Sequence, residues 1–307
     1  MSIADDRAII FVPGIRPKPP AEQQAAQLRR CIKVGVMKAG GDATLGATLA
    51  DVFQLVGWSR QFYGAHEDIA PDLPGIERLL TAENSREADA GEVLSLGNRM
   101  TAAMYALGDR FPLLTTLFST RRMASRVEEM HRYIHDHDGK ATIARAMVAD
   151  ALQTAWSNNQ RVLLIGHSFG SVIAYDTLWE LSRRQACPHK VDLFLSMGSP
   201  LTMRYIRARL KGADEVGEQR YPANIQRWLN LAAIGEVTAL DRKMSDYFGE
   251  MVTLNLLQSI EDDLGLINQF RGPNGLNVHK CYGYMASEEV GRVLCDWASD
   301  PAGTEPR

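Results

Sequence analysis

The chain of 307 residues carries 34 lysines and arginines against 37 aspartates and glutamates, a formal net charge of −3 at pH 7. A nucleic-acid partner requires an excess of basic side chains that neutralise phosphates, so this balance argues against one. With 45% hydrophobic and 23% charged residues, the composition is that of a globular protein that buries a sizeable core.

The cysteines and the amino-terminal segment indicate a cytoplasmic protein with free thiols. The first residues, MSIADDRAIIFVPG, contain two acids and a short apolar run instead of a basic signal peptide. No stretch approaches the roughly 18 to 20 apolar residues of a membrane-spanning helix, so we expect no integral membrane segment and leave peripheral membrane contact open. The four cysteines lack Cys-x-x-Cys spacing and are Cys31, Cys187, Cys281 and Cys295.

The first segments follow a strand, helix, strand pattern. Residues 8–12, AIIFV, form an apolar run closed by Pro13-Gly14, which predicts a strand buried on both faces of a parallel sheet. Pro19-Pro20 then opens residues 22–38, where apolar side chains recur at helical spacing. Residues 52–58, VFQLVGW, predict the next strand and complete a βαβ unit with a right-handed crossover.

A long insertion follows this unit. About 100 residues separate the strand at 52–58 from the next apolar run at 161–166, whereas a parallel crossover needs only a dozen or more. Much of the interval has helix-forming residues at helical spacing. We therefore expect a helical cap over residues 72–138, inserted into a core formed by residues 1–71 and 139–307.

The rest of the chain alternates helix and strand, which predicts an α/β fold with a mostly parallel, doubly wound sheet. The helix at 141–156 is expected to bury a stripe that includes Ile143, Met147 and Val148. The further predicted elements are the strand at 161–166, the helix at 170–184, the strands at 191–200 and 224–235, and a carboxyl-terminal helix at 283–298.

The strongest local signal is Gly166-His167-Ser168-Phe169-Gly170, a G-x-S-x-G run between an apolar strand and a helix. In such an elbow the serine occupies a strained backbone conformation, and the glycines lie where a side chain would collide with the neighbouring strand and helix. The helix amino terminus also places N–H groups beside the hydroxyl. We predict that Ser168 is a nucleophile; an unreactive strand-to-helix turn is the alternative.

A serine is nucleophilic at neutral pH only beside a base that takes its proton. His279 comes late in the chain, directly before the final helix, where the order serine, acid, histidine requires the base. We therefore predict that His279 is this base. The other histidines are His66 and His189 in loops, His131, His135 and His137 in the expected cap, and His167 in the elbow, which should point away from Ser168.

The third member must be a carboxylate that orients the imidazole. The strand at 224–235 is followed at once by Glu236 and then by Asp241 and Asp246, whereas no acid closely follows the strand at 191–200. Glu236 stands at the turn itself and is the preferred acid. Asp241 lies further on, where it can equally cap a helix, and it stays the alternative.

An acyl-transfer site also needs donors for the tetrahedral oxyanion. We expect these to be the backbone N–H groups of Phe169 and of Ile15, in the loop after the first strand. Gly14 permits the close approach of that loop. A plain β-turn is the alternative interpretation of the loop.

These segments together resemble the α/β-hydrolase fold family, in its lipase-like and esterase-like branches. The resemblance covers residues 8–60 and 140–298, and within it Pro13 stands where His or Gly is frequent and Glu236 where Asp is usual. The similar motifs are GHSFGSVIAYDTL at 166–178 as the elbow, FVPGI at 11–15 as the oxyanion loop, WLNLAAIGEVTALD at 228–241 as a W-x-N strand followed by the acid, and NVHKCYGY at 277–284 as the H-x-x-Y region of the base.

The resemblance implies a serine hydrolase that cleaves a carboxylic ester, a small acyl ester or a lipid-like molecule, through a covalent acyl-enzyme. A thioesterase or acyltransferase on the same triad, and a catalytically silent binding protein on a hydrolase scaffold, stay open. A silent scaffold has no physical need for a nucleophile, acid and base in this order, so the enzyme is preferred. Nothing in the sequence indicates the oligomeric state.

Two further segments invite other interpretations. HRYIHDHD at 131–138 offers metal-ligating side chains, but it lacks the Glu of H-E-x-x-H, and a polar helix end explains it without metal. We predict no metal and no cofactor. FPLLTTLFSTRRM at 111–123 combines an apolar run with two arginines, and burial within the cap is preferred over a lid that meets lipid.

Overall fold

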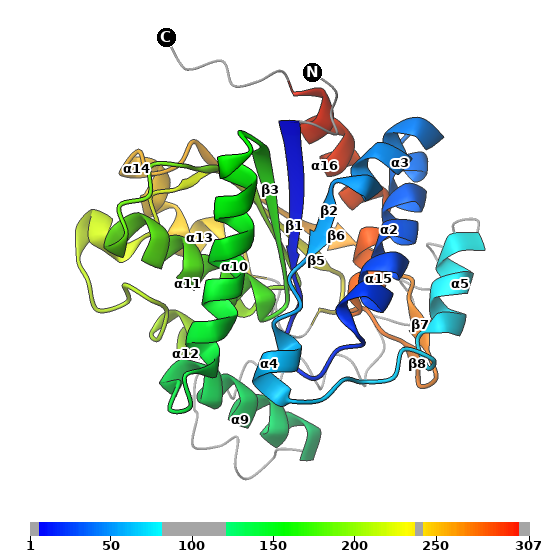
Figure 1. Ribbon diagram of the computed structural model, residues 1–307, viewed down its shortest axis with the longest axis horizontal. Helices are drawn as coiled ribbons and strands as arrows, with labels where there is room; N and C mark the ends of the chain where they lie inside the picture. Colours follow the sequence, from blue (N-terminus) through cyan, green and yellow to red (C-terminus); the bar gives the residue numbers. More distant parts are fainter. Residues whose placement is uncertain (1–5, 82–120, 237–241, 301–307) are drawn as a thin grey trace.

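The computed structural model describes residues 6–81, 121–236 and 242–300, which form a six-stranded parallel sheet with helices on both faces (Figure 1). The order of the strands in the sheet is β2-β1-β3-β4-β5-β6. The predicted α/β class with a doubly wound parallel sheet is confirmed. The strands are β1 Arg7–Val12, β2 Phe53–Leu55, β3 Arg161–His167, β4 Val191–Met197, β5 Ile225–Ala233 and β6 Ser259–Leu266, with a separate small hairpin of β7 Arg271–Gly272 and β8 Gly275–Leu276.

Helices α2, α3 and α16 cover one face of the sheet, and α10 and α11 cover the other (Figure 1). The α-helices are α2 Ala21–Lys38, α3 Ala43–Asp51, α4 Ser59–Tyr63, α5 Leu73–Thr81, α9 Arg121–His135, α10 Lys140–Ser157, α11 Gly170–Trp179, α12 Arg204–Arg207, α13 Ser245–Phe248, α14 Glu250–Thr253, α15 Cys281–Met285 and α16 Glu288–Ser299. A π-helical turn, Glu180–Arg184, extends α11.

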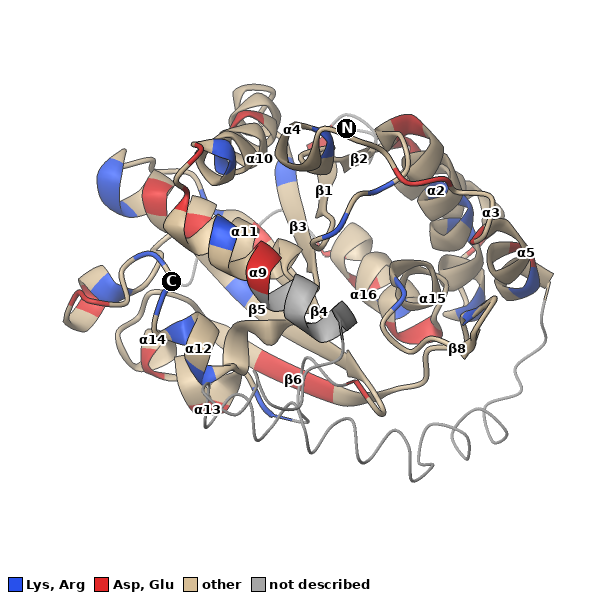
Figure 2. Cartoon of the chain, turned by 90° about the horizontal axis from the view of Figure 1, so that it is seen from below, with Lys and Arg blue, Asp and Glu red and all other residues tan. Residues whose placement is uncertain are grey.

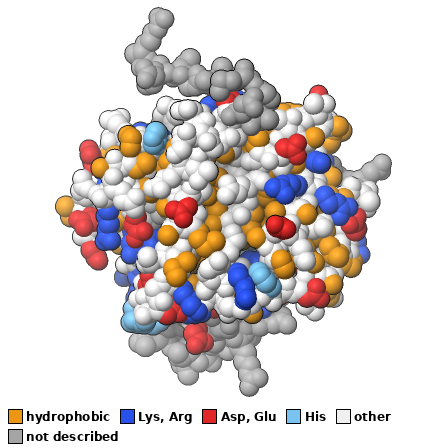
Figure 3. All heavy atoms as spheres, in the orientation of Figure 1, with side chains coloured by type: hydrophobic (Ala, Val, Ile, Leu, Met, Phe, Trp, Pro, Cys, Tyr) orange, Lys and Arg blue, Asp and Glu red, His pale blue; other side chains and the backbone are white. Residues whose placement is uncertain are grey.

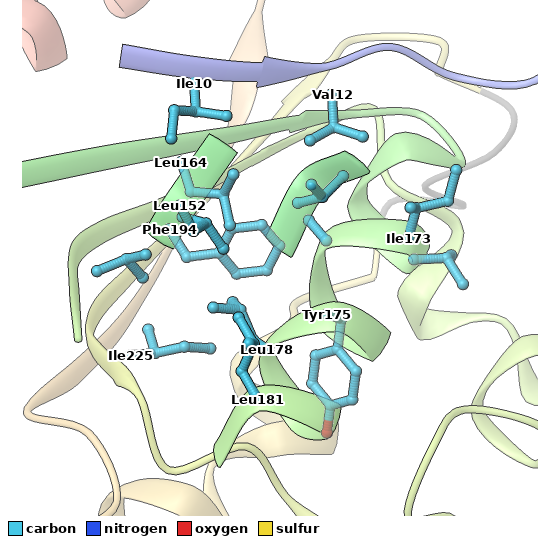
Figure 4. Close-up of a cluster of buried hydrophobic side chains, with 14 of the residues drawn as sticks. Ile10, Val12, Leu152, Leu164, Ile173, Tyr175, Leu178, Leu181, Phe194 and Ile225 are labelled. Atoms are coloured by element: carbon cyan, nitrogen blue, oxygen red, sulfur yellow. The ribbon is translucent and has the colours of Figure 1, made fainter. Parts of the chain in front are cut away.

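The continuous apolar runs of the central strands have two buried faces because successive side chains point to opposite sides. In β1, Ile10 and Val12 pack under α10 and α11, as Figure 4 shows, whereas Ile9 and Phe11 pack under α2 on the other face. All six residues of β1 are buried. The sheet therefore separates two hydrophobic layers, and the polar chemistry is left to the loops at its edges.

Two segments differ from the sequence prediction because of their polar residues. In one, a polar residue interrupts a predicted helix, and in the other, polar residues lie within a strand. The carboxyl-terminal helix predicted at 283–298 is broken at Ser287, whose hydroxyl accepts a hydrogen bond from the N–H of Val290 (3.2 Å) and begins α16. Strand β6 was not predicted. Its residues include Glu261 and Asp263 on the open edge of the sheet, visible as acidic positions in Figure 2, so it lacks the apolar run of a central strand.

The buried stripe predicted for the helix at 141–156 is partly wrong. Ile143 is 45% exposed, whereas Val148 and Ala151 are buried as predicted and are joined on the buried face by small residues such as Ala144. Small side chains allow α10 to approach α11 closely, which turns the larger Ile143 outward. The buried face also holds Arg145, which forms an ion pair with Glu180 (3.0 Å).

The expected cap at 72–138 is described only at its two ends, by α5 and α9. Residues 82–120, which include most of the apolar run at 111–123, lie outside the described residues.

No helix in the described ranges is long and apolar enough to cross a bilayer. The four cysteines form no disulfide. On the face shown in Figure 3, acidic and basic side chains are interspersed without a large region of one sign.

Helix α9 is joined to α11 by a buried carboxylate. Asp176 accepts hydrogen bonds from the hydroxyl of Tyr133 (3.0 Å) and from the backbone N–H of Lys211 (2.8 Å). Burial raises the pKa of Asp176 to about 6. A carboxyl group whose pKa is higher in the folded than in the unfolded state stabilises the fold at low pH, and this contribution is lost as the pH rises through the folded-state value.

We expect Asp176→Asn to remove this pH dependence. Relative to the variant, the wild-type protein should lose about 2 kcal/mol of unfolding free energy between pH 4 and pH 7.5. Urea denaturation of both proteins at these two pH values measures the difference. A difference that stays constant with pH would show that Asp176 titrates as an ordinary exposed carboxyl group.

Candidate active site

Ser168 lies in the sharp turn between β3 and α11. Its φ of 53° is in the left-handed region, which is strained for a residue other than glycine. The strand bonding extends into the turn, because the N–H of Ser168 donates to the carbonyl of Met197 (2.8 Å). Its carbonyl accepts from both the N–H (3.0 Å) and the hydroxyl (2.6 Å) of Ser171. The nucleophile position is thus held by backbone bonds on both sides.

The two glycines of the elbow lie where only glycine fits. A β-carbon at Gly166 would collide with the backbone of Ser171, and one at Gly170 would collide with the carbonyl oxygens of Val12 and Pro13. Strand β1 and helix α11 therefore approach each other more closely than any side chain would permit. This is the steric reason that the sequence pattern predicts an elbow.

The elbow stands where the strand order reverses. The chain passes from β1 to β2 on one side and then to β3 on the other side of β1, and ligands of open α/β sheets bind at the carboxyl ends of the strands beside such a reversal. The loop after β1 contacts the elbow directly, since a β-carbon at Gly14 would lie 3.2 Å from Ser168 Oγ. Figure 2 looks towards this edge of the sheet.

The structure brings together the three residues that the sequence selected. His279 Nε2 lies 2.9 Å from Ser168 Oγ, and His279 Nδ1 lies 2.8 Å from Glu236 Oε2. Because a carboxylate oxygen only accepts, Nδ1 carries the proton, and Nε2 of the neutral ring is left to accept from the serine hydroxyl. The geometry therefore allows proton transfer from Ser168 to His279.

Glu236 is buried beneath His279 in a space that glycine provides. Its side chain is 1% exposed, against 27% for that of His279. Gly198, at the end of β4 with φ 53°, makes room for it, since a β-carbon there would lie 2.9 Å from Glu236 Oε2. The hydroxyl of Tyr284 donates to the same oxygen (3.2 Å). The alternative acid, Asp241, lies outside the described residues.

The loop of His279 is held in place by hydrogen bonds from side chains to three successive backbone carbonyls of the loop. The side-chain amide of Asn268 donates to the carbonyls of Val278 and Lys280 (2.9 Å each). Nε2 of His167 lies 2.9 Å from the carbonyl of His279 itself. Asn268 is fully buried, and its own oxygen accepts from the N–H of Phe270 (3.1 Å). Neither Asn268 nor this use of His167 was predicted, because their partners are backbone atoms of a loop with no sequence signature.

His167 points away from Ser168, as expected, but it contributes to the site by contacting the base loop. Its ring is buried and lies parallel to that of Phe11, with centroids 6.4 Å apart. Burial, followed by the charges of His279 and Lys18, lowers the pKa of His167 well below its usual value. The ring is therefore neutral at physiological pH, and it must carry its proton on Nε2 to donate to the carbonyl of His279.

The expected oxyanion donors lie beside the nucleophile. Gly14 contacts Ser168 as described, Ile15 follows in the same loop, and Phe169 is the first residue after the nucleophile. Among the described residues, the backbone N–H groups of Phe169, Gly14 and Ile15 donate no hydrogen bond. Donors without a partner, next to a serine hydroxyl, are what a developing oxyanion requires.

The W-x-N pattern lies in β5, which Glu236 follows, and the H-x-x-Y pattern begins at His279. The hydroxyl of Tyr282 has no hydrogen-bond partner among the described residues, whereas the hydroxyl of Tyr284 donates to Glu236. Asn230 of W-x-N lies within the sheet, where it accepts from Ser196 (2.9 Å) and donates to Asp262 (2.9 Å). Asn230 therefore links β4, β5 and β6.

The acids of the 131–138 segment have protein partners. Asp136 accepts from the N–H groups of Ala141 (2.8 Å) and Thr142 (2.9 Å) at the start of α10, and Asp138 forms an ion pair with Arg132 (2.6 Å). Within the described residues no group of three or more His, Cys, Asp or Glu side chains is arranged to hold a metal ion. The ring of His135 stacks on that of His137 and lies tilted against that of His131. His66 contacts the carbonyl of Lys18 and His189 stacks on Trp156, so in the described structure these histidines have partners other than Ser168.

Comparison of the chain with protein-family models, with curated proteins and with solved structures found no match. The assignment of a function therefore depends on the geometry of the site alone.

We expect His167 to stay neutral, with its proton on Nε2, as the pH is lowered from about 8 through 6.5, where an ordinary histidine titrates. Imidazole ¹⁵N chemical shifts measured over this range, with the signal assigned by its absence in His167→Gln, report both the charge and the tautomer. Protonation of His167 near pH 6.5, or a proton on Nδ1, would contradict the hydrogen bond to the carbonyl of His279.

Proposed function

We propose that this chain is a serine hydrolase of the α/β-hydrolase type that cleaves a carboxylic ester through a covalent acyl-enzyme. The observation that carries the proposal is the pair of hydrogen bonds from His279, to Ser168 Oγ at 2.9 Å and to Glu236 Oε2 at 2.8 Å. The strained elbow of Ser168 adds to it, because such strain persists where the surroundings hold it and is concentrated at functional sites.

In the proposed reaction His279 Nε2 takes the proton of Ser168 as Oγ attacks the ester carbonyl. The carbonyl oxygen becomes an oxyanion that accepts from the N–H groups of Phe169 and Ile15. The tetrahedral intermediate collapses when the carbon–oxygen bond to the alcohol breaks, and His279 returns its proton to the leaving alcohol. Water then attacks the acyl-serine in the same way and releases the acid. Glu236 stabilises the imidazolium in both halves.

The positions of these residues along the sheet support the α/β-hydrolase assignment. Ser168 follows β3, Glu236 follows β5, and His279 lies after β6, so the chain order is serine, acid, histidine. The oxyanion loop follows β1, the neighbour of β3. All of them lie beyond the carboxyl ends of parallel strands.

A thioesterase or an acyltransferase would use the same residues, and a silent binding protein would not react. These classes are separated by chemistry rather than by fold. Labelling of the serine distinguishes an active site from a silent scaffold, and the acyl acceptor and leaving group preferred in assays distinguish among the enzymes. The proposed substrate is a small acyl ester or a lipid-like ester.

We expect a fluorophosphonate to modify Ser168 alone, since it is the hydroxyl that His279 can deprotonate. Intact-mass and peptide mass spectrometry should show one adduct on Ser168, and Ser168→Ala should show none. Hydrolysis of p-nitrophenyl esters should be lost in the same variant. A folded wild-type protein that gains no adduct and hydrolyses no ester would reject the proposed function.

Matched variants test the acid. Glu236→Gln keeps the shape of the side chain but removes its charge, so we expect kcat to fall by about 10²- to 10⁴-fold, by analogy with triad acids. Asp241→Asn should change kcat by less than about twofold, the scatter expected where no charge-assisted contact is removed. The reverse result would transfer the role to Asp241.

We also infer that the insertion at 72–138 lies over Ser168 and selects the substrate. Its two ends flank the site. At one end, Tyr133 of α9 packs edge-on against Phe169, with ring centroids 5.0 Å apart. At the other end, Gly75 of α5 packs against Phe270, whose N–H bonds to Asn268, the residue that holds the loop of His279. Insertions that gate the site of a rigid scaffold commonly determine access to it.

Leu114→Ala and Phe118→Ala should therefore shift the chain-length preference for p-nitrophenyl esters while phosphonate labelling of Ser168 is retained. Val216→Ala, at a residue that is 84% exposed, is the control for loss of an apolar side chain elsewhere. Equal chain-length profiles for all three variants and the wild-type protein would contradict the inference that the insertion selects the substrate.

A further inference from the structure

The loop between β1 and α2 is held by side chains instead of by secondary structure. The indole of Trp58 donates to the carbonyl of Pro13 (2.8 Å), and the ammonium group of Lys18 donates to the carbonyl of Ile15 (2.7 Å). The backbone N–H of Arg16 donates to the hydroxyl of Tyr63 (2.8 Å). Three of the polar backbone groups on either side of the Gly14–Ile15 peptide are therefore bound by side chains.

The third of these bonds coincides with backbone strain. Arg16 has a φ of 78°, in the left-handed region that side chains other than glycine's rarely adopt. Such a conformation persists only where the surrounding structure determines it. The residue that meets the backbone of Arg16 at this point is Tyr63, at the carboxyl end of α4.

Tyr63 is itself firmly placed. It packs edge-on against Phe62, with ring centroids 4.9 Å apart, and lies 6.2 Å from the ring of Trp58. Its hydroxyl accepts from Arg16 and donates to Glu129 Oε2 of α9 (3.0 Å), so both functions of the phenol are used. Burial raises the pKa of Tyr63, which keeps the phenol protonated and able to donate.

This arrangement determines which N–H groups of the loop are left for a substrate. Pro13 has no N–H, and that of Arg16 is taken by Tyr63. The N–H groups of Gly14 and Ile15 have no hydrogen-bond partner among the described residues, and Gly14 contacts Ser168. Without the bond to Tyr63, the strained Arg16 would relax and the peptide beside it would turn.

We propose that Tyr63 is a positioning residue that holds the loop so that the N–H of Ile15 serves as an oxyanion donor, and that Glu129 couples this donor to helix α9 of the insertion. The inference rests on the proposed hydrolase function and deepens it. In this proposal the hydroxyl of Tyr63 connects helix α9 of the insertion to the loop whose Ile15 N–H stabilises the oxyanion.

The test compares Tyr63→Phe, which removes only the hydroxyl, with the wild-type protein. An oxyanion donor acts in the transition state, so its misplacement lowers kcat and leaves KM nearly unchanged. We expect kcat to fall by about 10- to 100-fold, somewhat less than the loss of a whole oxyanion donor. The affinity for a trifluoromethyl ketone, which forms a tetrahedral adduct with the serine, should fall in parallel, whereas that for the matching uncharged ether should not.

Two further variants complete the experiment. Tyr221→Phe removes a comparable bond, from a tyrosine hydroxyl to Glu250 (2.6 Å) remote from the site, and should retain wild-type kcat. Glu129→Ala keeps the bond to Arg16 but frees the other side of the phenol, and its kcat should fall between those of Tyr63→Phe and the wild-type protein. Thermal melting checks that each variant is folded.

The outcomes separate this inference from the proposed function. A wild-type protein that is labelled by fluorophosphonate, together with a Tyr63→Phe variant that keeps kcat and ketone affinity within about twofold, the scatter of neutral changes, would overturn the role of Tyr63 alone. A loss of ketone and ether affinity to the same extent would make it a general binding residue. A wild-type protein that neither labels nor hydrolyses esters would remove the hydrolase function and this inference with it.

Discussion

The site depends on a single constraint, the left-handed backbone of Ser168 between β3 and α11. This turn is possible only because Gly166 and Gly170 let the helix start against β1 and against the neighbouring turn without a side chain between them. The same close approach brings the β1 loop, through Gly14, onto the serine. The positions of the proposed nucleophile and of the expected oxyanion donors thus follow from one steric requirement, and the loops of Glu236 and His279 are arranged around it.

In the loops, polar side chains supply the hydrogen-bond partners of backbone groups that neighbouring strands supply in the sheet. Buried backbone groups need partners, and irregular segments do not supply them internally. Asn268 supplies them for the loop of His279, and Trp58 and Tyr63, which are distant in sequence from their partners, supply them for the loop after β1. The loops of His279 and of Ile15 are therefore as closely determined as the strands beside them, although neither has regular secondary structure.

The sequence predicted what depends on local patterns. Apolar runs identified the central strands, and the spacing around Ser168 together with chain order selected His279 and Glu236, which the structure brings within hydrogen-bonding distance. Strand β6 was missed because an edge strand with Glu261 and Asp263 has no apolar run. Asn268 and Tyr63 were missed for a different reason: their partners are backbone atoms that come near only once the chain has folded, so no spacing announces them.

The adjacent residues His167 and Ser168 lie at one strand end but contact different parts of His279. Ser168 Oγ lies against the ring of His279, whereas the side chain of His167 bonds to the backbone carbonyl of His279. Both parts of His279 therefore contact the same short piece of backbone at the end of β3. A displacement of that strand end would move Ser168 and the loop of His279 together, which would preserve the 2.9 Å separation of Ser168 Oγ and His279 Nε2.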